Sequence, residues 1–97
     1  MLKMVIEFDG EKIKQGNPTA LNDMYGLLDN AFEKRNLKVC GNGVYTDNGN
    51  EEDLFQFMVL AGILSKKEWF VKFIKKWLWY EESDVSQDLI KTFEIAR

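Results

Sequence analysis

The residues whose types and spacing come closest to a binding site lie between residues 66 and 80. This segment has the period of an amphipathic helix, with an apolar side and a charged side that includes Lys72, Lys75 and Lys76. Trp79 departs from that division, because it projects between the lysines. Aromatic side chains dominate interface energies, and lysines steer a negatively charged partner. The pattern predicts that Trp79, Lys72, Lys75 and Lys76 contact an acidic patch on another protein, or nucleic acid.

The alternative for Trp79 is burial under lysine stems or under the last helix of the chain, since large aromatic side chains are mostly well buried. The two interpretations differ in what Trp79→Ala would do. An exposed contact residue would leave stability nearly unchanged and weaken partner binding, whereas a buried one would lower stability.

Residues 54–80 also loosely match a helix-turn-helix element. Gly62, followed by an apolar residue, lies where the turn would be, and Ser65 would cap the second helix. The absence of arginine between Arg35 and Arg97 argues against a DNA-reading role for this element, because arginine makes the commonest specific contact to a base. A small nucleic-acid-binding regulator is therefore an alternative function, which a salt-dependent gel shift would favour.

The sequence argues against most catalytic chemistry. It has no histidine, which removes the usual general base near neutral pH and the usual zinc ligand. The single cysteine, Cys40, is expected to be a small, half-buried hydrophobic side chain. Carboxylate pairs such as Asp9/Glu11 and Glu81/Glu82 are expected at the solvated surface, so an enzyme would need carboxylates that converge only in the fold. No catalytic, cofactor-binding or metal-ligating residue is predicted.

Two loops resemble ligand-binding motifs but fail in their spacing. The acidic segment 47–53 has Glu52 and Met58 where a calcium loop needs a glycine and a bidentate glutamate. Residues 41–43 contain two glycines, but Thr46 stands where the dinucleotide fingerprint has its third. The first loop therefore predicts helix capping, and the second predicts a tight turn.

Two hairpins are expected to form the sheet. Apolar residues alternate between residues 2 and 8, and Asp9-Gly10 then predicts a tight turn that pairs Glu7 with Lys12. The second hairpin is expected over residues 37–47, around a turn at residues 42–43 that places Cys40 opposite Tyr45. The sequence leaves open whether the two hairpins share one sheet.

Four helices are expected to pack on this sheet. Asn17 and Pro18 open the first, which ends near Asn36. Asn50 caps the second, which is apolar on nearly every side up to residue 64 and is therefore expected to be the buried centre of the domain. A capping box at residues 65–68 starts a third helix that runs to about residue 80, and Asp84 with Gln87 is expected to cap the last.

The chain of 97 residues, with 45% hydrophobic and 30% charged residues, predicts a single α+β domain over residues 1–97. Its expected architecture is a small antiparallel sheet of two hairpins packed on three to four helices, in the order ββαββααα. No segment has the length of a signal peptide's apolar region or of a membrane span, which favours a cytoplasmic protein without a membrane partner.

The function favoured by the sequence is a noncatalytic protein–protein interaction module, such as a bacterial accessory, inhibitor or immunity-type protein. The small size, the formal charge of −3 and the lack of a catalytic constellation all point this way. Both a monomer and a homodimer are compatible with the sequence, because the segment 66–80 has more aromatic residues than one side of a small core needs.

Overall fold

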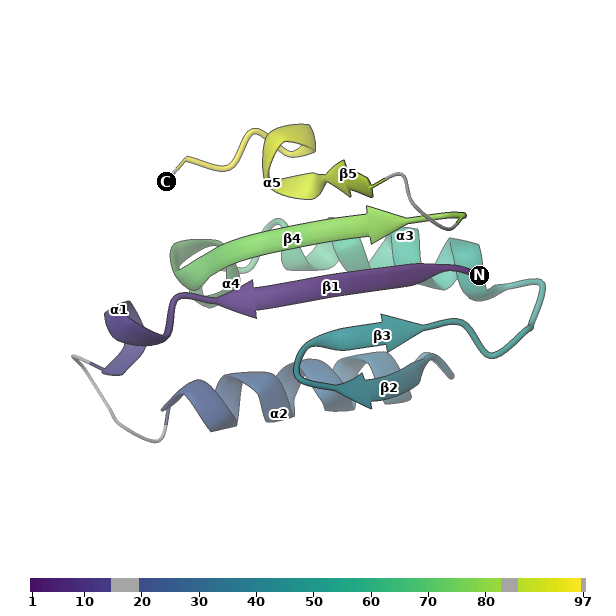
Figure 1. Cartoon of the computed structure of the whole chain (residues 1–97), viewed down its shortest axis with the longest axis horizontal. Coiled ribbons are helices and arrows are strands. Elements are labelled where there is room, and N and C mark those ends of the chain that lie inside the picture. Colours follow the sequence, from purple (N-terminus) through teal and green to yellow (C-terminus); the bar gives the residue numbers. More distant parts are fainter. Residues whose placement is uncertain (15–19, 83–85, 97) are drawn as a thin grey trace.

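A computed structural model of the chain describes residues 1–14, 20–82 and 86–96 (Figure 1). Five strands form one antiparallel sheet in the order β2-β3-β1-β4-β5. The two longest helices, α2 and α3, lie behind the sheet in the view of Figure 1. The elements are β1 (Lys3–Phe8), α1 (Gly10–Lys14), α2 (Ala20–Glu33), β2 (Lys38–Gly41), β3 (Val44–Thr46), α3 (Asp53–Leu64), α4 (Glu68–Phe73), β4 (Ile74–Tyr80), β5 (Ser86–Asp88) and α5 (Leu89–Thr92).

The α+β class is confirmed, but the expected element order is wrong, beginning with the first hairpin. β1 is followed by α1 and not by a second strand. Asp9 accepts a hydrogen bond on Oδ1 from the backbone N–H of Lys12, at 3.2 Å. Asp-Gly therefore starts a helical turn here, because an aspartate that ends a strand also suits the N-cap position. Glu7, expected opposite Lys12, instead pairs with Lys76 of β4.

The second hairpin is confirmed as β2 and β3, and its turn has positive φ at both Asn42 and Gly43. Its register differs from the expected one. Val39 pairs with Tyr45, and an irregularity between Val39 and Gly41 leaves Cys40 as the extra residue. Because successive side chains alternate between the two sides of a sheet, this shift leaves Cys40 exposed where half-burial was expected.

The helix expected over residues 66–80 is the largest error of the sequence prediction. It divides into the six-residue helix α4 and the strand β4. β4 pairs with β1 on one side and with β5 on the other, so it lies inside the sheet. Its residues include isoleucine, tryptophan and tyrosine, which favour strands once neighbouring strands are available to pair with.

The predicted helix ends are confirmed in part. α2 corresponds to the first predicted helix, and Asn36 beyond it has the expected left-handed conformation, with a φ of 60°. The predicted capping box is wrong: the Ser65 hydroxyl donates to the carbonyl of Gly62 at 2.7 Å, so Ser65 ends α3 and does not begin α4. The short helix α5 is capped by Asp88. The predicted caps Asn17 and Asp84, together with Pro18, lie outside the described residues.

Aromatic contacts join the sheet to the helices behind it. The ring of Phe32 on α2 stacks on Tyr45 of β3, with centroids 3.8 Å apart. Phe70 of α4 meets Trp77 of β4 edge to face, at 4.9 Å. These side chains are almost completely buried, and they fix α2 and α4 on the same side of the sheet.

Candidate interaction surface

α3 is buried on one side only. Phe57, Leu60, Ala61 and Leu64 face the core, as expected of an amphipathic helix. The prediction that this helix forms the buried centre of the domain is nevertheless wrong, because large apolar side chains on its other side are exposed. They are Leu54, Phe55, Met58 and Ile63.

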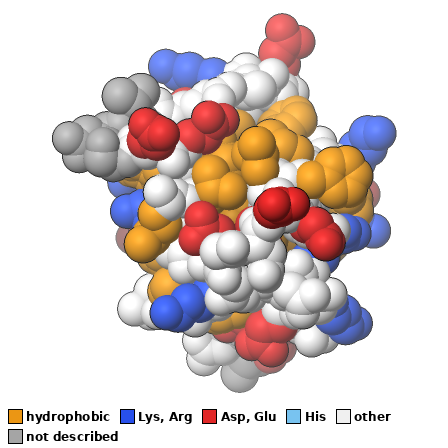
Figure 2. All heavy atoms as spheres, turned by 90° about the vertical axis from the view of Figure 1, so that its right-hand side faces the viewer, with side chains coloured by type: hydrophobic (Ala, Val, Ile, Leu, Met, Phe, Trp, Pro, Cys, Tyr) orange, Lys and Arg blue, Asp and Glu red, His pale blue; other side chains and the backbone are white. Residues whose placement is uncertain are grey.

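We call this second side the outer face of α3; it consists of Leu54, Phe55, Met58, Val59, Gly62 and Ile63. Successive members are one or three positions apart, and each pair of neighbours recurs after four, which places them on one side of a helix. Phe55 projects furthest, with 66% of its surface exposed. Figure 2 looks at the end of the molecule where the chain enters α3, and it shows hydrophobic side chains near its centre with acidic side chains above and below them and basic side chains at the right-hand edge.

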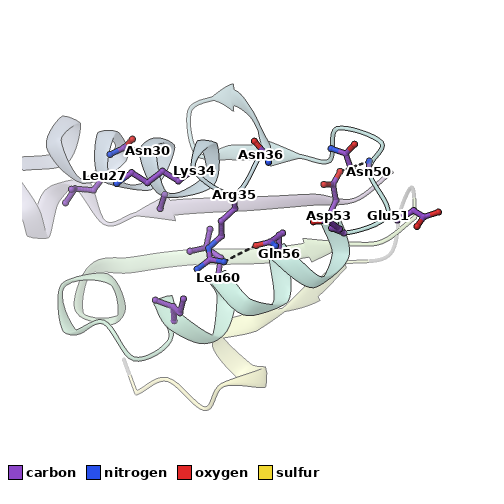
Figure 3. A pocket seen from close by; sticks show the side chains of 13 residues that line it. Leu27, Asn30, Lys34, Arg35, Asn36, Asn50, Glu51, Asp53, Gln56 and Leu60 are labelled. Atoms are coloured by element: carbon purple, nitrogen blue, oxygen red, sulfur yellow. Dashed lines mark hydrogen bonds between the residues drawn. The ribbon is translucent and has the colours of Figure 1, made fainter.

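A groove of about 950 Å³ separates α3 from α2 beside this face (Figure 3). Leu27, exposed on α2, and Ile63 on α3 contribute apolar walls. The Arg35 guanidinium crosses from the end of α2 and donates a 2.9 Å hydrogen bond from Nη1 to Oε1 of Gln56 on α3. The groove thus combines apolar walls with a polar bridge, and it continues the outer face of α3 toward α2.

The loop before α3 is held by Asp53. This carboxylate is 2% exposed, and its Oδ2 accepts hydrogen bonds from the backbone N–H groups of Asn48, at 2.7 Å, and Asn50, at 3.1 Å. The side-chain amide of Asn48 in turn donates to the carbonyl of Asn36, just after α2. These bonds tie the start of α3 to the end of α2 and fix the two walls of the groove relative to each other.

The structure does not bring the predicted contact residues together. Trp79 is only 3% exposed, and its Nε1–H donates to Oε1 of Glu81 at 3.3 Å. The expectation of an exposed tryptophan among lysines is therefore wrong and the alternative, a buried Trp79, is confirmed, because residues 74–80 form a strand and Trp79 points into the core. Because Trp79 is buried, the prediction that it contacts an acidic patch on another protein has no basis.

The three lysines remain at the surface. Lys72 lies on α4. Lys75 and Lys76 lie near the start of β4, and their Nζ atoms are 3.9 and 4.0 Å from the carboxylate oxygens of Glu7. Glu7 therefore offsets part of the positive charge of this pair. Partner binding through the three lysines stays a prediction.

The helix-turn-helix element that the alternative interpretation placed over residues 54–80 is not formed. α3 and α4 follow each other, but the second helix has six residues and gives way to an internal strand of the sheet. A recognition helix needs an exposed side long enough to enter the major groove, which this arrangement does not supply. Nucleic-acid binding by another surface stays a prediction.

Tyr45 is a core residue with a strongly raised pKa. Burial, together with a 2.7 Å hydrogen bond to Asp29, raises the pKa of Tyr45 far above that of a free tyrosine, but this side chain lies in the core and does not line the groove. Within residues 1–14, 20–82 and 86–96, no group of three or more histidine, cysteine, aspartate or glutamate side chains is placed to hold a metal ion.

None of the helices in the same ranges has both the length and the apolar composition needed to cross a membrane.

No protein-family model matches this chain, and no curated protein matches it at a significant level. The outer face of α3 and the groove beside it are therefore the features on which a functional proposal can be based.

Proposed function

We propose that the protein is a noncatalytic protein-interaction module that binds through the outer face of α3 and the adjoining groove. The observation that carries this proposal is the exposure of Leu54, Phe55 and Met58 on one side of a helix whose other side is buried in the core. Soluble monomers rarely expose contiguous apolar patches of this kind except where they bind something. Fully burying an exposed side chain of this kind contributes about 1.5–3 kcal/mol, and these side chains, which are 42–66% exposed, can gain roughly half of that.

The surroundings of the outer face favour a protein as the partner. An aromatic side chain at the centre of a patch, with polar groups at its rim, is the usual arrangement of a protein–protein interface. Here Phe55 is the exposed aromatic side chain of the outer face, and the exposed acids Glu51 and Glu52 precede the helix that carries it. An accessory, inhibitor or immunity-type role would use such a surface through shape and charge complementarity alone.

Site-specific photo-crosslinking in the cells that produce the protein tests this function. A photoreactive residue replaces Phe55 in one variant and the exposed Lys12 of α1 in the control variant. We expect a covalent adduct with a polypeptide at position 55 and none at position 12. Equal labelling at both positions, or no adduct at position 55, would contradict the proposal.

A further inference from the structure

We propose that the occupant of the outer face of α3 is a second copy of the same chain, packed with its α3 antiparallel to the first across a two-fold axis. This inference rests on the proposed function, because it names the partner of the same surface. It follows from a symmetry within α3 itself: the residues of the outer face are arranged evenly about the midpoint between Met58 and Val59.

The symmetry pairs the outer-face residues across the axis. When two identical helices cross antiparallel on a two-fold axis, residues at equal distances from the crossing point face each other. With the axis at the midpoint of α3, Met58 faces Val59 of the second copy, and Leu54 faces Ile63. These contacts are apolar and each occurs twice, so that one helix side supplies both halves of the interface.

The largest and smallest residues of the face are paired in the same way. Phe55 lies opposite Gly62 of the second copy, at equal distances from the midpoint. The Phe55 side chain is 66% exposed, and the space where Gly62 would carry a Cβ has no heavy atom within 4 Å. A protruding ring therefore meets an open, flat stretch of helix, and glycine allows the two helices to approach closely. This contact also occurs twice.

Charges at the two ends of α3 fit the same arrangement. The acids Glu51 and Glu52 come directly before the helix, and Lys66 and Lys67 follow it after Ser65; all four are exposed. The flanking residues Glu52 and Ser65 keep right-handed helical backbone angles, so the helical path extends beyond each end.

With the two-fold axis at the midpoint of α3, Glu51 lies opposite Lys66 of the second copy. An antiparallel pair thus joins opposite charges at both ends, whereas a parallel pair would place like charges together. Antiparallel helix dipoles add to this preference. The charge pattern is therefore complementary to a second copy and favours its antiparallel orientation.

Sedimentation velocity on the purified full chain, over a range from about 1 to about 500 µM, tests the inference. We expect a concentration-dependent equilibrium between monomer and dimer. Gly62→Leu should weaken the dimer at least about tenfold by occupying the space for Phe55, although replacing a helical glycine should stabilise the monomer. If the dissociation constant of the dimer is the same for Gly62→Leu as for the parent chain, the proposal is overturned.

Charge reversal provides a second set of variants at exposed positions, where folding is not at risk. Glu51→Lys and Lys66→Glu should each weaken the dimer several-fold, and the double variant should restore it, because the opposite charges meet again across the axis. Lys12→Glu, on α1, is the matched control and should leave association unchanged. Failure of the double variant to restore the dimer would argue against the antiparallel pairing.

The two proposals fail in different ways. If the purified chain stays monomeric at every concentration while crosslinking at position 55 captures a different polypeptide, the second copy is wrong and the interaction function stands. If the chain stays monomeric and position 55 gives no adduct, both are wrong. A crosslinked product of twice the chain mass, together with the dimer in solution, supports both.

Discussion

The indole of Trp79 packs against the ring of Phe57, with centroids 4.9 Å apart and planes inclined at 58°. Phe57 belongs to the buried side of α3, and Trp79 lies on β4, paired with Met4 of β1 and Gln87 of β5. The contact therefore fixes α3 on the sheet and determines which side of α3 is left for a partner. Under the proposed function, Trp79 contributes to binding only indirectly, by holding the helix that carries the outer face.

Trp79→Ala should lower the free energy of unfolding by about 3–5 kcal/mol, because it removes a buried aromatic side chain and leaves a cavity against Phe57. Urea denaturation followed by circular dichroism measures this loss.

Phe55→Ala is the matched control, since it removes an aromatic side chain from the exposed side of the same helix. In dilute solution, where the monomer predominates, it should change the free energy of unfolding by no more than about 0.5 kcal/mol. Similar losses in the two variants would contradict the assignment of the two sides of α3.

The errors in the predicted fold arise where distant pairing outweighs a local signal. Alternation between residues 2 and 8 correctly indicates a strand, but its neighbour β4 comes near the end of the chain, and no local pattern connects the two. Residues 74–80 fit a helix as readily as a strand by their spacing, and they become a strand because β1 and β5 pair with both edges. The β2–β3 hairpin was predictable because its turn and both of its strands are adjacent in sequence.

Tyr45 should make stability depend on alkaline pH. Burial and the hydrogen bond to Asp29 raise its pKa above that of the unfolded chain, which is about 10. Above that pH the unfolded state releases the tyrosine proton and the folded state keeps it, so stability is lost as the pH rises, by about 1.4 kcal/mol per pH unit. Urea denaturation across this range measures the slope.

Tyr45→Phe isolates this contribution. Near neutral pH the variant should be less stable by about 0.5–1.5 kcal/mol, because the hydrogen bond to Asp29 is lost. About one unit above the pKa of free tyrosine, the difference between variant and parent should fall toward zero, since phenylalanine has no proton to release. A difference that stays constant with pH would show that Tyr45 ionises normally in the folded protein.

Asp53→Ala should lower the free energy of unfolding by about 1–3 kcal/mol, because the backbone N–H groups of Asn48 and Asn50 lose their acceptor. Asp53→Asn keeps an acceptor oxygen and should lose less. Glu52→Ala is the control, since Glu52 precedes the helix without a side-chain capping bond and should cost at most about 0.5 kcal/mol. Equal losses for Ala and Asn at position 53 would argue against the hydrogen bonds as the cause.

The candidate surface was harder to predict than the fold. Residues 54–64 are almost uniformly apolar, which fits a helix surrounded by core as well as a helix with one side in the core and the other on a partner. Only the arrangement of the layers decides between them. α3 packs on one side of a single sheet, so the apolar side chains on its other side have no core to enter. The sequence shows that residues 54–64 are unusually apolar, but it does not show which of them face the core.

Gly43 lies in the turn between β2 and β3, directly beside β1. Its φ is +79°, and a Cβ at this position would lie 2.0 Å from the carbonyl oxygen of Ile6. The backbone here is also paired, because the N–H of Ile6 donates to the carbonyl of Gly43 at 2.8 Å. Any side chain at position 43 must therefore push the hairpin away from β1.

Gly43→Ala and Gly49→Ala separate this close approach from the cost of the backbone conformation. Gly49 has nearly the same φ, +77°, but an added Cβ would meet nothing within 4 Å. Gly49→Ala should therefore lower the free energy of unfolding by only about 1–2 kcal/mol, which is the cost of an alanine in the left-handed conformation. Gly43→Ala should cost clearly more, or prevent folding altogether, because the β1–β3 pairing must open as well. Thermal unfolding of the two variants measures the difference, and equal shifts in Tm would mean that β3 does not approach β1 as closely as the structure has it.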